Sequence, residues 1–169
     1  MNKINISYHK SEAGELIIGS FCGKICIADF RYRRMRNTID DRIKKALKAD
    51  FIESEDTIIN ETKKQIDEYL QGARREFDIP FLTVGSDFQK KVWTALLNVP
   101  YGKTASYSDL AESINNPKAV RAVANANGAN ALAFIIPCHR IIRADGNTGG
   151  YGGGLSVKKK LLKMERENK

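Results

Sequence analysis

Long apolar runs and cysteines are scarce in this sequence of 169 residues. No segment approaches the roughly 18 consecutive apolar residues that a membrane-spanning helix needs. The first residues lack the apolar stretch and small-residue cleavage site of a signal peptide. The cysteines are too few and odd in number for a disulfide framework: Cys22, Cys26 and Cys138. We therefore expect a cytoplasmic protein whose cysteines are thiols.

Motifs for common cofactors are absent as well. The glycine-rich segment 145–154 contains no Gly-x-x-x-x-Gly-Lys-Ser/Thr pattern, which argues against a nucleoside-triphosphate site. His9, Cys22 and Cys26 are the only zinc-ligand candidates of the first half, and their spacing matches no standard zinc pattern. We interpret them as small buried residues of strands, and we expect neither a metal nor an organic cofactor.

Acidic residues are scarce in only one half of the chain. Residues 1–85 hold 15 Lys and Arg against 14 Asp and Glu, whereas residues 86–169 hold 13 against 6. The net charge of +8 therefore resides almost wholly in the second half. Such an excess indicates a polyanionic partner, and nucleic acid is the first candidate. An ordinary solvated basic surface is the alternative.

The first half, residues 1–80, reads as a small α/β domain with antiparallel strands. Apolar patterns predict strands at 4–9 and 16–29, the second divided by a hairpin turn at Gly23-Lys24. Amphipathic patterns predict helices at 38–49 and 56–71. The basic segment 31–36 is either a strand edge or a surface face. A stretch that contains proline then leads to a domain boundary near residues 80–86.

The second half, residues 86–169, reads as mostly helical. Two capping sequences, with serine at the N-cap and a polar partner three residues on, open helices at Ser86 and Ser106. In the Asn-Asn-Pro turn that follows, Asn116 is expected to cap a third helix from Pro117 to about Asn127. Two capped helices joined by a short turn predict a helix-turn-helix, winged-helix-like, so the expected fold class is α+β.

The third of these helices is predicted to have one buried and one open face. At about 100° per residue, Val120, Val123 and Ala124 share the buried face. The opposite face combines small side chains with two cations: Lys118, Arg121, Ala122, Asn125 and Ala129. Small residues allow close approach to a nucleic-acid groove and cations bind phosphates, so we interpret this face as a DNA contact. A plain surface helix is the alternative.

The most informative segment is an apolar run, 131–136, that ends in Pro137-Cys138-His139-Arg140. A base beside Cys138 favours the reactive thiolate, and His139 can act if a water bridges the two or the backbone turns. The last predicted helix, at about 156–167, has an apolar face of Val157, Leu161 and Met164. Glu165 lies on the flank of that face and could orient His139. A surface glutamate is the alternative.

These residues and their neighbours resemble a known family. The motif around Cys138 is similar to the active-site motif of the O6-alkylguanine–DNA alkyltransferases, also called methylated-DNA–protein-cysteine methyltransferases. The likeness covers residues 86–167 nearly continuously and rests on Phe88-Gln89, Val92-Trp93, Pro100-Tyr101-Gly102, Ser106-Tyr107, Pro117-Lys118-Ala119, Arg121-Ala122-Val123, Gly149-Gly150-Tyr151-Gly152-Gly153-Gly154-Leu155, and Leu161-Leu162 with Glu165.

The resemblance implies DNA repair by direct transfer of a methyl or larger alkyl group from O6 of guanine, or from O4 of thymine, to Cys138. The transfer is irreversible, so the implied enzyme is a methyltransferase of a single turnover. His139 would act through a water, with Glu165 behind it. Tyr107 would donate a proton to the departing guanine. Asn130 resembles the hinge asparagine of the family, which links the recognition helix to the site.

The resemblance also implies how DNA is held. The expected partner of a monomer is double-stranded DNA with O6-alkylguanine, bound in its minor groove, with the damaged nucleotide flipped out. Arg121 would occupy the space that this nucleotide leaves. The other expected DNA contacts are Tyr107, Ser108, Asn116, Lys118 and Ala122. The substrate pocket would be lined by Pro137, Tyr151 and Gly152, with segment 145–154 as a flexible wall.

Two rival functions use the same residues. A cysteine hydrolase could employ Cys138 and His139, although the sequence offers no evident oxyanion hole. A helix-turn-helix regulator could bind DNA through the basic half without any chemistry. The expected cytoplasmic repair protein would need access to DNA, at the nucleoid or in the nucleus.

Overall fold

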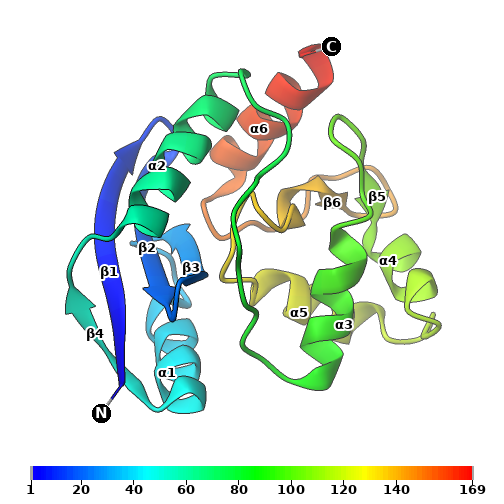
Figure 1. Ribbon diagram of the computed structural model, residues 1–169. Coiled ribbons are helices and arrows are strands. Elements are labelled where there is room, and N and C mark those ends of the chain that lie inside the picture. Colours follow the sequence, from blue (N-terminus) through cyan, green and yellow to red (C-terminus); the bar gives the residue numbers. More distant parts are fainter. Residues whose placement is uncertain (1, 169) are drawn as a thin grey trace. The chain divides into compact units, whose positions relative to one another are not determined.

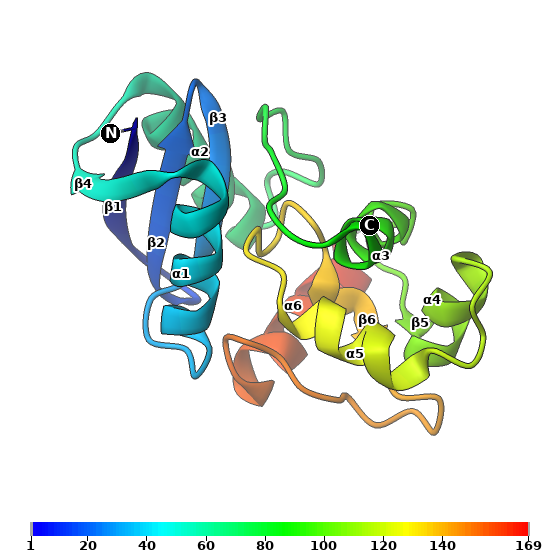
Figure 2. The same cartoon turned by 90° about the horizontal axis from the view of Figure 1, so that it is seen from below.

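A computed structural model describes residues 2–168 of the chain (Figures 1 and 2). The chain divides into two compact units, with the division between Gly85 and Ser86. The first unit contains a four-stranded sheet and two helices, and the second is mostly helical. This mixture confirms the predicted α+β class. Among the described residues, no helix combines the length and apolar character that crossing a membrane requires.

The sheet of the first unit has the strand order β3-β2-β1-β4. Strands β1 (Asn2–Ser11), β2 (Gly14–Phe21) and β3 (Lys24–Phe30) are antiparallel, as predicted. Strand β4 (Ala49–Glu53) pairs in parallel with β1 and was not predicted. The predicted helix 38–49 ends earlier, because Lys48 adopts a left-handed conformation with φ of 50° after α1 (Arg36–Leu47).

The β2–β3 hairpin turns at Cys22 and Gly23, one residue before the predicted turn. Both residues have positive φ, 50° and 77°, and this pair of conformations matches the twist of a two-residue hairpin. The interpretation of all three zinc candidates as buried strand residues is therefore wrong for Cys22, which is exposed. Cys26 is buried in β3, where its thiol lies 3.7 Å from the Gly19 carbonyl oxygen, and burial raises its pKa to about 12. His9, half-buried on β1, lies 2.8 Å from an Asp67 carboxylate oxygen.

Helix α2 (Thr57–Leu70) covers strands β1 to β3, as Figure 1 shows. Its N-cap is Asp56, whose side chain accepts a hydrogen bond from the Ile59 amide at 2.9 Å. The face toward the sheet buries Ile59, Ile66 and Tyr69. The basic segment 31–36 is not a strand edge: it is a turn before α1, in which Arg33 and Arg36 pair with the buried Asp29 at 3.2 and 3.0 Å.

The second unit contains four α-helices: α3 (Asp87–Leu96), α4 (Tyr107–Ser113), α5 (Val120–Gly128) and α6 (Leu155–Glu167). Both predicted capping boxes are present, at Ser86 and Ser106. Figure 2 shows α3, α4 and α5 grouped together, with α4 and α5 as the helix-turn-helix. Trp93 connects α3 to α5 by donating its indole N–H to the Ala126 carbonyl of α5 at 2.8 Å.

Helix α5 starts three residues later than predicted. A turn in which the Ala119 amide donates to the Asn116 carbonyl precedes it, and Ala119 is the N-cap without a side-chain bond. Asn116 is therefore not the cap. The buried face is Val123, Ala126 and Asn127, whereas Val120 and Ala124 are half-buried. Ala129, expected on the open face, is 5% exposed because it follows the last turn into the core.

Candidate active site

A short parallel pairing brings the segment of Tyr107 beside that of Cys138. Strands β5 (Ala105–Ser106) and β6 (Ile141–Ile142) pair in parallel, residue by residue. Tyr107 follows β5 directly, and the 3-10 turn η1 (Cys138–Arg140) directly precedes β6. Burial, and second the nearby charge of Cys138, raises the pKa of Tyr107. The phenol therefore keeps its proton in a position close to the thiol.

The segment before Cys138 is buried throughout and is held by asparagines. Residues 131–136 all lie in the core, as the apolar run predicted. The Asn130 side chain donates to the carbonyl of Ile136 at 2.9 Å and of Leu132 at 3.3 Å, and accepts from the Leu132 amide at 3.0 Å. Asn127 of α5 donates to the Cys138 carbonyl at 3.4 Å. These bonds connect the end of α5 to the backbone of Cys138 and of the segment before it.

Cys138 sits at the start of a turn rather than in an extended segment. The backbone turn, one of the two arrangements that the sequence left open, is present, and the bridging water stays a prediction. Cys138 is 7% exposed, and His139 is 0% exposed. Cys138 thus keeps a small exposed fraction, while His139 is shielded from bulk water.

Behind the thiol lies a buried chain of His139, Glu165 and Arg140. The Nε2 atom of His139 is 2.7 Å from Oε2 of Glu165. Arg140 donates two hydrogen bonds to the same carboxylate, from Nε to Oε1 at 2.8 Å and from Nη2 to Oε2 at 3.1 Å. Its Nη1 donates to the Val99 carbonyl at 2.8 Å, and the Gly102 amide donates to Oε1 at 3.2 Å. The guanidinium balances the carboxylate charge, as buried charges require.

This arrangement fixes the protonation of His139. Burial lowers its pKa, although the hydrogen bond and charge of Glu165 act in the opposite direction. The imidazole is therefore neutral at neutral pH. Because the carboxylate accepts at Nε2, the ring proton belongs on Nε2 and the basic lone pair on Nδ1. His139 thus offers one basic nitrogen from a position next to Cys138 in the chain.

The face of α6 toward the core differs from the predicted one. Lys158, Leu161 and Glu165 are buried, whereas Val157 and Met164 are half-buried. The helix is rotated so that two charged side chains point inward, which is possible because each has polar partners. Lys158 Nζ donates to the carbonyl of Ile141 at 2.5 Å and of Gly150 at 3.2 Å. Burial lowers the pKa of Lys158 to about 8, against the charge of Cys138.

The glycine-rich segment 145–154 packs against the site. At Gly149, where φ is +70°, an added Cβ would lie 2.8 Å from the Tyr107 hydroxyl, so only glycine fits there. The Tyr151 ring meets the His139 ring edge-on, with ring centres 6.3 Å apart. Gly152 is half-buried and Pro137 is buried. Of the predicted pocket residues, Tyr151 therefore contacts His139 and Pro137 directly precedes Cys138 in the chain.

The residues expected to contact DNA lie on α4, α5 and the turn between them. Asn116, Lys118, Arg121 and Ala122 are exposed, and Ser108 is half-buried. Of the predicted open face, Arg121, Ala122 and Asn125 of α5 are at the surface, as is Lys118 in the turn before it, whereas Ala129 is buried.

Three residues of the site were not assigned from the sequence: Asn127, Arg140 and Lys158. Arg140 was part of the motif, but nothing in the spacing indicated that it binds Glu165. Lys158 and Glu165 do share one helix face with Leu161, at spacings of three and four residues, and this signal could have revealed them together.

Known proteins are similar to this chain. The sequence model of a family described as "6-O-methylguanine DNA methyltransferase, DNA binding domain" matches residues 87–167. A methylated-DNA–protein-cysteine methyltransferase of Methanosarcina barkeri is 46% identical over 120 residues, which are 71% of this chain and 75% of the relative. A protein of the same name from Mycobacterium tuberculosis is 49% identical over 102 residues, 60% of this chain and 62% of the relative.

Solved structures agree with these relatives. The crystal structure of Mycobacterium tuberculosis OGT in complex with DNA has a TM-score of 0.82 and 31% identity, and the match covers 98% of this chain and 94% of that one. The structure of the O6-methylguanine methyltransferase from the same organism matches with the same TM-score and coverage at 32% identity. Long coverage and substantial identity go together here, and the matched residues include the buried chain behind Cys138. The chain belongs to the family of methylated-DNA–protein-cysteine methyltransferases.

Proposed function

We propose that this protein repairs DNA by moving an alkyl group from O6 of guanine onto the sulfur of Cys138. The observation that carries the proposal is the buried chain of His139, Glu165 and Arg140 directly behind a slightly exposed cysteine. Such a chain can accept the thiol proton in a site closed to bulk water. Membership of the methyltransferase family supplies the class of substrate.

The first step is formation of the thiolate. The proton of the Cys138 thiol passes to Nδ1 of His139, directly or through one water, and Glu165 stabilises the imidazolium that results. The thiolate then attacks the alkyl carbon. The S–C bond forms as the bond between that carbon and O6 breaks, and the bonding electrons stay on the oxygen. A thiolate suits this carbon because both partners are soft.

The second requirement is a proton for the departing guanine. Tyr107 provides a phenol close to the reaction, and its raised pKa keeps the proton available until negative charge develops on the base. His139 holds the proton that left the thiol, and this proton returns through solvent to the Tyr107 phenolate, so both side chains end in their starting protonation states. One thiol proton is lost, one guanine proton is gained, and the alkyl group changes partners.

The product explains why each molecule acts once. A thioether on Cys138 offers no leaving group that water or a neutral imidazole can displace. The other cysteines, Cys22 and Cys26, belong to the first unit, so the second unit holds no further thiol to regenerate the first. The proposed enzyme is therefore consumed by its own reaction.

The helix-turn-helix is the proposed DNA-binding element, and it binds in the minor groove of double-stranded DNA. Small residues on the open face of α5 allow close approach, and Arg121 enters the stack where the damaged nucleotide has flipped out. Asn116, Lys118, Ala122 and Ser108 make the neighbouring contacts. Asn130 links α5 to the segment before Cys138, so binding and chemistry share one support. All these residues come from one chain, which supports a monomer as the active unit.

The flipped base would lie between Cys138, Tyr107 and the glycine-rich segment, with Pro137, Tyr151 and Gly152 around it. Lys158 stabilises this wall by binding the Gly150 carbonyl. O4-alkylthymine presents the same kind of alkyl carbon and is a second substrate for the same pocket.

Labelling with free O6-benzylguanine separates the proposal from its rivals. The wild-type protein should gain one benzyl group, and Cys138→Ala should gain none while it still binds duplex DNA. A cysteine hydrolase would release the group again, and a regulator would gain none. Cys26→Ala is the matched control and should be labelled as the wild type is. Transfer by Cys138→Ala would overturn the assignment of the acceptor.

A further inference from the structure

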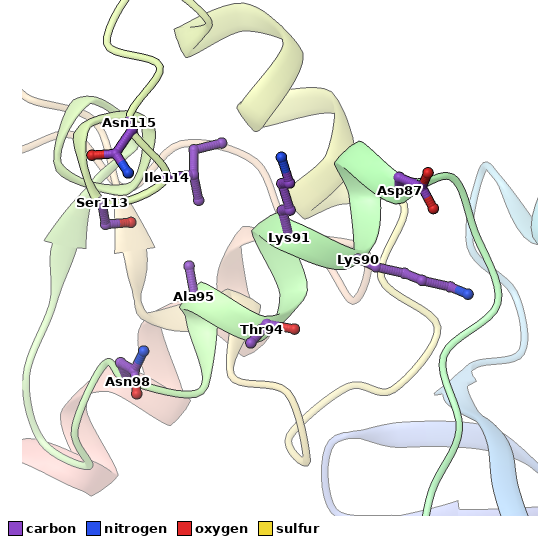
Figure 3. A pocket seen from close by; sticks show the side chains of 9 residues that line it. All are labelled: Asp87, Lys90, Lys91, Thr94, Ala95, Asn98, Ser113, Ile114 and Asn115. Atoms are coloured by element: carbon purple, nitrogen blue, oxygen red, sulfur yellow. The ribbon is translucent and has the colours of Figure 1, made fainter.

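A groove apart from the Cys138 site runs between α3 and the turn that joins α4 to α5 (Figure 3). Its volume is about 770 Å³. One stripe of α3, at spacings of three and four residues, forms one wall, and segment 113–115 forms the other. None of these residues belongs to the chain behind the thiol or to the predicted DNA contacts.

The walls of the groove are polar and open. Seven of the nine lining residues are exposed, and only Ala95 and Ile114 are half-buried, so they make a narrow apolar strip. Figure 3 shows Lys91 on the side of α3 near Ile114, whereas the Lys90 side chain extends away from Ile114. The two ammonium groups outnumber the single carboxylate of Asp87. An open groove of this kind does not suit a small apolar ligand, which binding sites normally enclose.

The groove is continuous with the helix-turn-helix. Segment 113–115 leads without interruption to the exposed Asn116 and Lys118, and then to Arg121 on α5. Exposed cations therefore occur on α3, in the turn before the recognition helix and on that helix. Hydroxyl and amide groups of Thr94, Asn98, Ser113 and Asn115 line the same path, and such groups commonly bind phosphate oxygens.

We propose that this groove holds the sugar–phosphate backbone of the DNA beside the helix-turn-helix. Lys90 and Lys91 contact phosphates, and a deoxyribose packs on the strip of Ala95 and Ile114. This inference rests on the proposed function, because it extends the footprint of the same DNA. It adds the exposed face of α3 to a DNA surface that would otherwise consist of α4, α5 and their turn.

The test compares Lys90→Gln/Lys91→Gln with the wild type in binding to an unmodified DNA duplex at several salt concentrations. Each lost phosphate contact should weaken binding roughly tenfold at 0.1 M salt and lower the slope of log affinity against log salt by about 1. The matched control is Lys159→Gln/Lys160→Gln, which removes two exposed cations from α6 outside the groove. It should bind nearly as the wild type does.

A second pair of variants tests the groove itself rather than its lysines. Thr94→Glu places a negative charge between the walls and should weaken DNA binding severalfold. Thr94→Gln adds similar volume without charge and should change binding little. Both substitutions are at an exposed helix position, so neither disturbs packing.

Labelling by free O6-benzylguanine keeps the two claims apart. All these variants should be labelled at the wild-type rate, since the free base needs no DNA contact. Absence of labelling in the wild type would defeat the proposed function. Normal labelling together with unchanged DNA affinity and salt slope in the lysine variant would overturn the inference, as would an equal loss in the α6 control. If the groove binds a protein instead of DNA, the lysine variant will show this unchanged DNA affinity and salt slope.

Discussion

At the scale of single residues, the Glu165 carboxylate connects three other residues of the site. It receives bonds from His139, Arg140 and the Gly102 amide, and it is 2% exposed. Its charge compensates a guanidinium that is itself 8% exposed at the side chain. One residue therefore supports both the protonation of the base and the charge balance of the core.

Replacement of Glu165 by glutamine should consequently cost both stability and rate. Removing one partner of a buried ion pair leaves an uncompensated charge and costs roughly 3–5 kcal/mol. Denaturant unfolding measures the first effect, and the rate of benzyl transfer to Cys138 measures the second. Glu167→Gln, an exposed position on the same helix, should stay within about 0.5 kcal/mol of the wild type. An equal stability of both variants would contradict this role of Glu165.

His139 should make the protein less stable in mild acid. The fold lowers its pKa, so below the ordinary value of about 6.5 the unfolded chain takes up a proton that the folded chain does not. The free energy of unfolding should therefore fall as pH drops from about 6.5 toward the folded pKa. Above that range the contribution of His139 to stability is fully present.

The measurement is denaturant unfolding at pH 7.5, 6.5 and 5.5. His139→Gln should remove this part of the slope, while His9→Asn, which replaces the other histidine, should keep it. A slope that persists without change in His139→Gln would show that other groups are responsible.

The motif residues of the site could be chosen from the sequence, but their network could not. Cysteine next to histidine is visible in the motif, whereas the partner of Glu165 depends on how α6 is rotated. An apolar pattern predicts that Val157 and Met164 face the core. The structure turns Lys158 and Glu165 inward instead, because carbonyls and Arg140 supply their partners. Such compensation depends on segments far apart in the sequence.

At the scale of elements, α5 connects the proposed DNA contact to the proposed acceptor. Its open face carries Arg121, and its last turn carries Asn127, which donates to the Cys138 carbonyl. The residue that follows the helix by two, Asn130, holds the segment before the thiol. A displacement of α5 would therefore also move the backbone around Cys138.

Substitution of Arg121 by alanine should slow transfer from duplex DNA at least tenfold and leave transfer from free O6-benzylguanine within about twofold. In the proposed complex Arg121 fills the stack only when a nucleotide has flipped, and the free base requires no flipping. Single-turnover rates on the two substrates provide the measurement. Lys160→Ala, which removes an equal charge from α6, is the control. Equal losses on both substrates would count against the flipping role.

The elements themselves were predictable where local signals were strong. Serine capping boxes located the starts of α3 and α4, and glycine at the hairpin located the β2–β3 turn to within one residue. Strand β4 was missed because Ala49–Glu53 is short and pairs with the distant β1. The start of α5 was misplaced because a separate turn at Asn116 uses the residues that resemble a cap.

At the scale of the whole molecule, one unit carries both the excess positive charge and the whole of the proposed site. The second unit contains Cys138, the buried chain, the helix-turn-helix and the α3 groove. Composition indicated this asymmetry, since the acidic residues are concentrated in the first half. The first unit contributes a well-packed sheet, and no part of its sequence indicated a chemical role.

The central claim is that Cys138 accepts one alkyl group and keeps it. The most direct test is to titrate the protein with excess duplex DNA that carries O6-methylguanine, and to follow the intact mass of the chain and its peptides. The account predicts a plateau near one methyl group per chain, located wholly on the peptide that contains Cys138. Continued conversion of DNA over many equivalents, or methyl groups on Cys22 or Cys26, would contradict it.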